Sequence, residues 1–251
     1  MANEYIQHDH EVVSNTVAQP AVAKLLAKVM LFMALGLAIT FGLSFGLFYA
    51  FLYFFGYDGM FVPLIVSLVV GLLGSIITSI VFSVKSIKNR GRLLIPYLVY
   101  AVFFGLALMF VPLISAVAPD IVLMAGGVTV SIFIVMGIIG LVSKVDLSPL
   151  ATIGIGLFFG AIFLSLLNLI FYLTGLTAYV NFLYILVEAL MFMVILIFTV
   201  VDFNRIKRIT MSEANPSQNI VVFCAFMLYV DFINIFLRVL RILLIVMGRR
   251  R

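Results

Sequence analysis

Seven long apolar runs alternate with short polar breaks along this chain of 251 residues. A helix that crosses a bilayer needs about 20 predominantly apolar residues, and each run reaches that length. The breaks hold Gly, Pro, Asp, Asn or basic residues and are too short to form another domain. The pattern therefore predicts an all-α integral membrane protein, a bundle of seven transmembrane helices. The expected spans are 29–55, 60–84, 93–117, 121–142, 150–173, 180–201 and 220–247.

The same pattern divides the chain into two regions. Residues 1–24 are expected to form a cytoplasmic N-terminal tail, and residues 25–251 a single transmembrane domain. The HDH sequence at residues 8–10 could bind a metal, but nothing nearby would fix its geometry, so a polar tail is the favoured interpretation. The first apolar run is too long for a signal peptide, and we expect it to be retained as a helix.

Basic residues predict the orientation of the bundle. Lys and Arg lie beside the start of the first run and in the second, fourth and sixth connections, whereas the other three connections have none. Because basic residues favour the cytoplasmic side, we expect the N-terminus in the cytoplasm and, after seven spans, the C-terminus outside. The basic tail 249–251 would then lie on the outer side. A re-entrant last helix that returns to the cytoplasm is the alternative.

Composition agrees with a membrane protein and argues against several functional classes. Hydrophobic residues make up 65% of the chain and charged residues 10%, against roughly 45–50% and 25% in soluble domains. The net charge of +5 comes from residues that the orientation already explains, so nucleic acid is not an expected partner. We expect no enzyme, because no Ser/His/Asp arrangement, HExxH, GxGD or phosphate-loop motif occurs in the sequence.

The last apolar run carries polar residues that a lipid-facing helix would not tolerate. Four of them fall within an arc of about 80° on one helix face: Asp231, Asn234, Arg238 and Arg241. An intramembrane charge costs at least ~2.5–3.5 kcal/mol at the bilayer centre unless it is paired or faces water. We therefore expect this C-terminal helix to be central in the bundle, wrapped by the others. A purely structural role for the stripe is the alternative.

Candidate partners for these charges lie in the sixth run. Glu188 and Asp202 are fourteen residues apart, so a helix places them on one face and about 21 Å apart along its axis. Because consecutive spans run antiparallel, we expect Asp202 at the depth of Asp231, near the cytoplasmic mouth. Glu188 is expected in the outer half of the bundle. The predicted outer ion pair joins Glu188 to Arg241, or else to Arg238.

An approach of Asp202 to Asp231 would create a site with distinct chemistry. Two carboxylates in a low-dielectric site cannot both ionise cheaply, so we expect them to share a proton and titrate as a unit. Carboxylate oxygens also suit Ca²⁺, which takes about six to eight oxygen ligands. A proton, calcium and a nearby basic side chain would then compete for one site. Such competition is a basis for a pH-dependent gate.

Three segments of the sequence resemble the Bax inhibitor-1 family, also called the transmembrane Bax inhibitor motif family, in a bacterial form. They are VTVSIFIVMGIIGLVSKVDLSPL (128–150), VVDFNRIKR (200–208) and MLYVDFINIFLRVLR (227–241). The resemblance implies a seven-helix fold with the last helix at the centre. It also implies calcium leak across a membrane and a pH-sensitive pair of aspartates. On this chain the pair falls on Asp202 and Asp231, which are then the expected calcium ligands.

The resemblance also suggests roles for charged residues around the pair. The family arginine ten residues beyond the second aspartate matches Arg241. Bacterial relatives carry an acid inside the second helix that this chain lacks, and Glu188 is the candidate to replace it. A closed-state latch, an arginine in relatives, falls here on Lys85 or Lys88, and lysine has no bidentate fork. Arg238 stands where relatives have an uncharged polar residue.

These inferences converge on a pH-sensitive calcium or cation leak channel gated by the paired aspartates. The expected partners are the lipid bilayer, Ca²⁺ and H⁺, and a membrane protein in one alternative. Ca²⁺ is expected as the permeant or bound ion, with no other cofactor. A proton-coupled cation antiporter is one alternative function. The other is a non-transporting, cytoprotective regulator of a membrane protease or of cell-death machinery. The expected location is a bacterial cell membrane.

Overall fold

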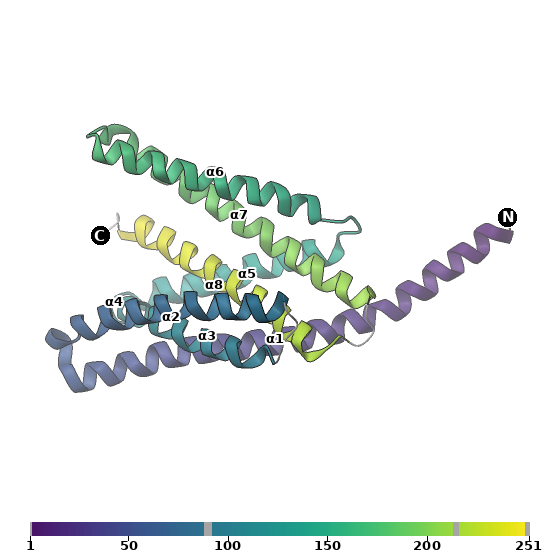
Figure 1. The fold of residues 1–251 in the computed structure, drawn as a ribbon, viewed down its shortest axis with the longest axis horizontal. Helices are drawn as coiled ribbons and strands as arrows, with labels where there is room; N and C mark the ends of the chain where they lie inside the picture. Colours follow the sequence, from purple (N-terminus) through teal and green to yellow (C-terminus); the bar gives the residue numbers. More distant parts are fainter. Residues whose placement is uncertain (1, 88–91, 213–215, 249–251) are drawn as a thin grey trace. The chain divides into compact units, whose positions relative to one another are not determined.

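The computed structural model describes residues 2–87, 92–212 and 216–248, and these residues form helices and short connections without a strand (Figure 1). By length and composition, six helices in this part of the chain can cross a membrane. The predicted all-α membrane fold is therefore confirmed. The helices are α1 (Ala2–Gly59), α2 (Phe61–Ile87), α3 (Leu94–Ala107), α4 (Phe110–Val117), α5 (Pro119–Val142), α6 (Ser148–Leu173), α7 (Thr177–Ser212) and α8 (Gln218–Gly248).

A backbone break lies near the end of the first candidate membrane span, within α1. The apolar part of this helix covers Val22–Gly59, and Gly56 interrupts it with φ 65° and ψ −178°. Only glycine adopts this conformation readily, because it has no Cβ. The break falls directly after residue 55, where the sequence predicted the end of the span. The helix assigned to α1 also includes most of the expected tail, and the side chains of residues 2–21 lie outside the described part.

The third expected span, 93–117, is not one straight helix. It consists of α3 and α4, which are bent by 45° relative to each other. Pro112 has no N–H, so it cannot donate to the carbonyl of Leu108 four residues earlier. Two other donors reach this carbonyl: the hydroxyl of Ser44 at 2.8 Å and the N–H of Val111 at 2.9 Å. The chain therefore has six candidate spans in its described part, or seven if the bent pair crosses as one.

The helices belong to two compact units. One unit contains Met1–Met124 and Arg208–Tyr229, and the other contains Ala125–Lys207 and Val230–Arg251. Helix α8 contributes its N-terminal part to the first unit and its C-terminal part to the second. In α8, 56% of the apolar window is buried, compared with 11–28% in the other five candidate spans of the described chain. The last helix is thus the most buried of these spans, as its polar stripe predicts.

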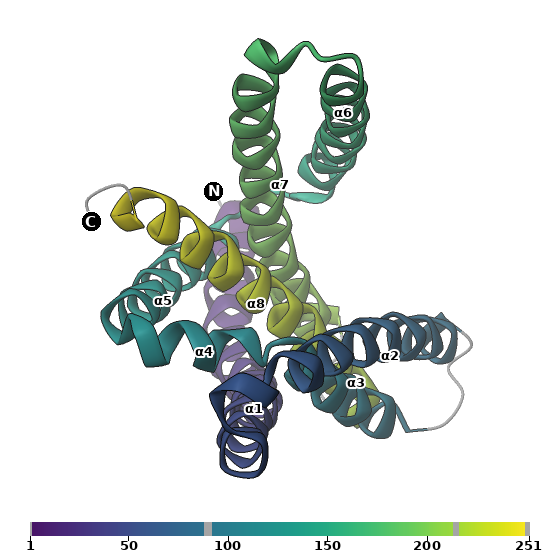
Figure 2. The same ribbon diagram turned by 90° about the vertical axis from the view of Figure 1, so that its left-hand side faces the viewer.

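In the first unit, α2 and α3 lie side by side (Figure 2). A Cβ added at Gly71 would lie 2.3 Å from the backbone nitrogen of Ala107. Glycine is therefore what lets these two backbones approach so closely, which is a common device where helices pack in lipid.

The N-terminal part of α8 is fixed among aromatic rings of the first unit. Tyr229 contacts the rings of Tyr97 and Tyr100 edge to face. Its hydroxyl forms a buried hydrogen bond of 2.6 Å with Thr40, which also donates to the carbonyl of Ala101 at 3.0 Å. These contacts hold the N-terminal part of α8 within the first unit.

Candidate functional site

Two aspartates from different helices meet in the second unit. Asp202 lies on α7 and Asp231 on α8, and their side chains lie within hydrogen-bonding reach of each other. Because an ionised carboxylate only accepts hydrogen bonds, the two groups can bond to each other only when one of them carries a proton. Asp231 is buried, with 8% of its surface exposed. The structure therefore brings together the two carboxyl groups that the sequence singled out.

Two further side chains act on the aspartates. The Thr199 side chain lies beside Asp231, and its single hydroxyl proton is donated to the carbonyl of Ile195 at 2.8 Å. One carboxyl oxygen of Asp231, Oδ2, is buried and has no hydrogen-bond partner among the described residues. Arg205 lies close enough to Asp202 to attract its carboxylate electrostatically. The site thus combines two carboxyl groups, a hydroxyl and a guanidinium.

The segment of α7 that carries the first aspartate is tied to the connection between α5 and α6. The amide nitrogen of Asn204 donates to the carbonyl of Gly140 at 3.2 Å, and its oxygen accepts the N–H of Leu147 at 3.5 Å. Lys207 donates to the carbonyl of Ser143 at 3.0 Å, just past the end of α5. A cation suits this position, because the last carbonyls of a helix carry partial negative charge.

The backbones of α5 and α7 also touch at a glycine. A Cβ at Gly140 would lie 2.5 Å from the carbonyl oxygen of Val200 and 2.7 Å from the Cβ of Phe203. The close approach and the Asn204 hydrogen bonds act on the same turn of α7. Together they fix the direction in which Asp202 points.

A second charged cluster joins the same two helices. Glu188 of α7 binds both arginines of the α8 stripe, with its Oε2 atom 2.5 Å from Nη1 of Arg238 and its Oε1 atom 2.5 Å from Nη1 of Arg241. The sequence left open which arginine would pair with Glu188, and the structure pairs it with both. We call these three residues the ion triad. One carboxylate against two guanidiniums leaves a net charge of about +1.

No contact is described between the aspartates and the latch expected at the end of the second helix. Lys85 lies exposed in the last turn of α2, in the first unit, and Lys88 lies outside the described residues. The latch therefore stays a prediction. Within the second unit, the base that acts on the pair is Arg205. The sequence pattern predicts Arg205 in a connection after a sixth span that ends at residue 201, whereas α7 continues to Ser212.

Calcium would find only part of a ligand set at this site. The described residues contain no group of three or more His, Cys, Asp or Glu side chains able to hold a metal ion. Asp202, Asp231 and Thr199 offer fewer oxygen atoms than the about six to eight that Ca²⁺ takes. Water would have to supply the remaining ligands. The role of the two aspartates as calcium ligands therefore stays a prediction.

Comparison with known proteins identifies the family. The family model described as "Inhibitor of apoptosis-promoting Bax1" matches residues 22–249, a range that contains both aspartates and the ion triad. An uncharacterized protein of Borreliella burgdorferi is 29% identical over 125 residues. This match covers 50% of the present chain and 50% of the relative, so the chain spans about half the length of that relative. The family model, by contrast, covers nearly the whole chain, and the protein therefore belongs to the Bax inhibitor-1 family.

Proposed function

We propose that this protein is a pH-sensitive cation leak channel of a bacterial cell membrane, that calcium is its permeant ion, and that Asp202 and Asp231 form its gate. The observation that carries the proposal is the close approach of these two carboxyl groups on different helices. Acidic residues within membrane spans are costly and commonly mark ion or proton pathways. Membership of the family supports the same class of membrane protein.

The proton between the two carboxyl groups determines what the pair can do. With the proton in place, the hydrogen bond ties α7 to α8. Without it, two negative charges about 4 Å apart repel each other by about 4 kcal/mol at an effective dielectric constant of about 20. The charges must then separate, bind a cation or be neutralised by a base. A free energy of this size shifts a two-state population by roughly a thousandfold.

Three species can therefore compete for the pair. A proton ties the carboxyl groups together, Ca²⁺ replaces it with carboxylate ligation, and a cationic side chain neutralises the charge without a permeant ion. Arg205 is the base that acts on Asp202 within the second unit. Because protons and calcium compete for the same oxygen atoms, calcium binding at the pair is expected to weaken as the pH falls.

Calcium flux into proteoliposomes across a pH series tests this proposal. The wild type is expected to show a pH-dependent flux, and Asp202→Asn and Asp231→Asn should each flatten the pH profile. Asparagine keeps the shape of the side chain but removes the shared charge. A calcium flux that requires and dissipates a proton gradient would instead indicate an antiporter. The absence of flux from correctly folded protein would favour a regulator that does not transport ions.

A further inference from the structure

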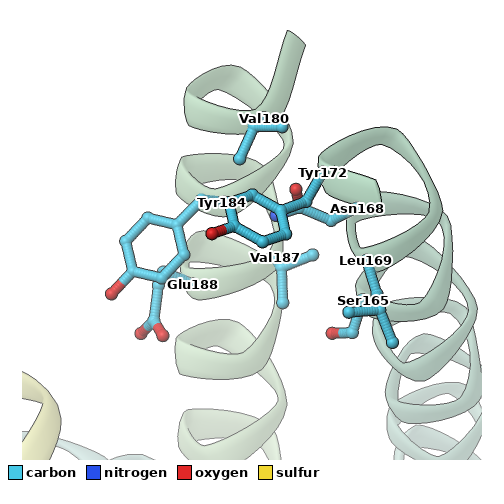
Figure 3. A pocket seen from close by; sticks show the side chains of 8 residues that line it. All are labelled: Ser165, Asn168, Leu169, Tyr172, Val180, Tyr184, Val187 and Glu188. Atoms are coloured by element: carbon cyan, nitrogen blue, oxygen red, sulfur yellow. The ribbon is translucent and has the colours of Figure 1, made fainter. Parts of the chain in front are cut away.

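A pocket of about 350 Å³ lies between α6 and α7, close to the turn that joins them (Figure 3). Both helices belong to the second unit. Gly175, with φ 79°, makes this tight turn possible. The pocket extends into the membrane span, because Ser165 lies eight residues before the end of α6, or about 12 Å along the axis. The lining residues are Ser165, Asn168, Leu169, Tyr172, Val180, Tyr184, Val187 and Glu188.

Polar side chains from both helices line part of this pocket. In Figure 3, Ser165, Asn168 and Tyr172 extend from α6 toward α7, while Tyr184 and Glu188 come from α7. The amide oxygen of Asn168 is buried and receives no hydrogen bond from the part of the chain that the structure describes. This oxygen needs a donor, because an unsatisfied buried acceptor costs free energy.

The charge at one end of the pocket narrows the choice of occupant. Glu188 lines the pocket and belongs to the ion triad, in which two guanidiniums outweigh its carboxylate. Both carboxylate oxygens of Glu188 are already bound to guanidiniums, which disfavours an ammonium group or another cation at this end. An acyl chain would leave the Asn168 oxygen without a donor and would place the triad against hydrocarbon. A small, neutral hydrogen-bond donor can both bond to the Asn168 oxygen and solvate the charged end of the pocket.

We propose that this pocket is an aqueous vestibule, through which water enters the membrane span from the α6–α7 turn and reaches the ion triad. A volume of about 350 Å³ exceeds the space needed for a single water molecule many times over. Water donates to the Asn168 oxygen and hydrates the Glu188 carboxylate of the triad. The inference goes beyond the leak function, because it concerns a site apart from the aspartates and needs no ion flux.

Cysteine labelling with a permanently charged, water-soluble thiosulfonate tests the vestibule in the full-length protein in membranes. The variants are Ser165→Cys on one wall of the pocket and Val187→Cys on the other. Phe163→Cys is the matched control: it lies on the same helix about 3 Å away along the axis and about 160° around it. Phe163 is exposed and does not line the pocket. The wild type supplies the blank, since Cys224 is buried.

Both pocket variants are expected to react about 100-fold faster than Phe163→Cys, because hydrocarbon excludes the charged reagent. Two positions on different helices keep the test valid if one variant fails to fold. Equal rates at the pocket and control positions, whether fast or slow, would overturn the proposal. Reaction of the pocket cysteines only with a lipid-soluble maleimide would also overturn it, because the pocket would then contain lipid. None of these outcomes depends on whether the protein conducts calcium.

Discussion

Glu188 should contribute far more to the stability of the protein through its ion pair with Arg238 than through its ion pair with Arg241. Glu188→Gln keeps the size of the side chain and leaves both guanidiniums without their counter-charge. The side chain of Arg238 is 19% exposed, whereas that of Arg241 is 54% exposed. The two ion pairs have the same length, so the difference in burial should decide the difference in free energy.

The magnitudes follow from that difference. Breaking a buried ion pair by removing one partner costs about 3–5 kcal/mol, and the slight exposure of Arg238 places its pair at about 3 kcal/mol. An ion pair exposed to water contributes about 0–1 kcal/mol, which is the value expected for Arg241 because the proposed vestibule hydrates the triad. Two double-mutant cycles in reversible unfolding from detergent micelles measure these couplings, with Arg238→Gln in one cycle and Arg241→Gln in the other.

The charge-reversed pair gives a second measurement of the same cluster. Glu188→Arg and Arg241→Glu should each lower stability, and their combination should restore part of the loss because opposite charges again face each other. A coupling near zero for Glu188 with Arg238 would refute the reasoning from burial. So would a larger coupling for the more exposed Arg241.

Two further predictions concern helix contacts. Gly140→Ala should lower the free energy of unfolding by about 1–3 kcal/mol, because its Cβ would clash with the Val200 carbonyl. Gly156→Ala is the matched control, because a Cβ at this helical position would have no described atom within 4 Å. This variant should be neutral or stabilising by up to about 1 kcal/mol. Equal effects of the two substitutions on the free energy of unfolding would contradict the clash. Ser44→Ala should cost about 1 kcal/mol, because it removes a donor to the Leu108 carbonyl. Stability unchanged within the error of the measurement would show that the bend does not use this hydrogen bond.

The apolar runs predict most of the fold because lipid imposes a length on each span. Backbone groups in hydrocarbon must pair within their own helix, so spans are long and their sequence signal is strong. The α2, α5 and α6 helices accordingly begin and end within a few residues of their expected bounds. The bend in the third span was missed, although Pro112 carries a signal for it. The length of an apolar run does not show that Pro112 lacks the backbone N–H that a straight helix would use.

The parts of the candidate site that the sequence predicted are charged residues whose helical spacing places them on one face of a helix. Asp231 and its stripe could not face lipid, and the spacing of Glu188 and Asp202 matched two depths on one facing helix. Arg205 was not foreseen beside the pair, because a basic residue after an apolar run was interpreted as part of a connection. Its position three residues after Asp202 is the signal that was available, since such residues are neighbours on a helix.

Other features depended on contacts that no local pattern specifies. The hydrogen bonds of Asn204 join residues that are 57 and 64 positions apart in the sequence. The orphaned oxygen of Asn168 becomes evident only when the pocket around it is seen. Side chains of this kind look like ordinary polar residues near helix ends until their partners are known.

The central claim is that Asp202 and Asp231 act as one proton-sharing gate, and the double variant Asp202→Asn/Asp231→Asn tests it most directly. Calcium flux should be measured in proteoliposomes across a pH series, with Asp120→Asn as the control, because Asp120 is an exposed aspartate in the first turn of α5. The account predicts that the control keeps the wild-type pH profile, whereas the double variant loses both calcium binding at the pair and the pH dependence of flux. Wild-type flux with an unchanged pH profile in the double variant would contradict the claim.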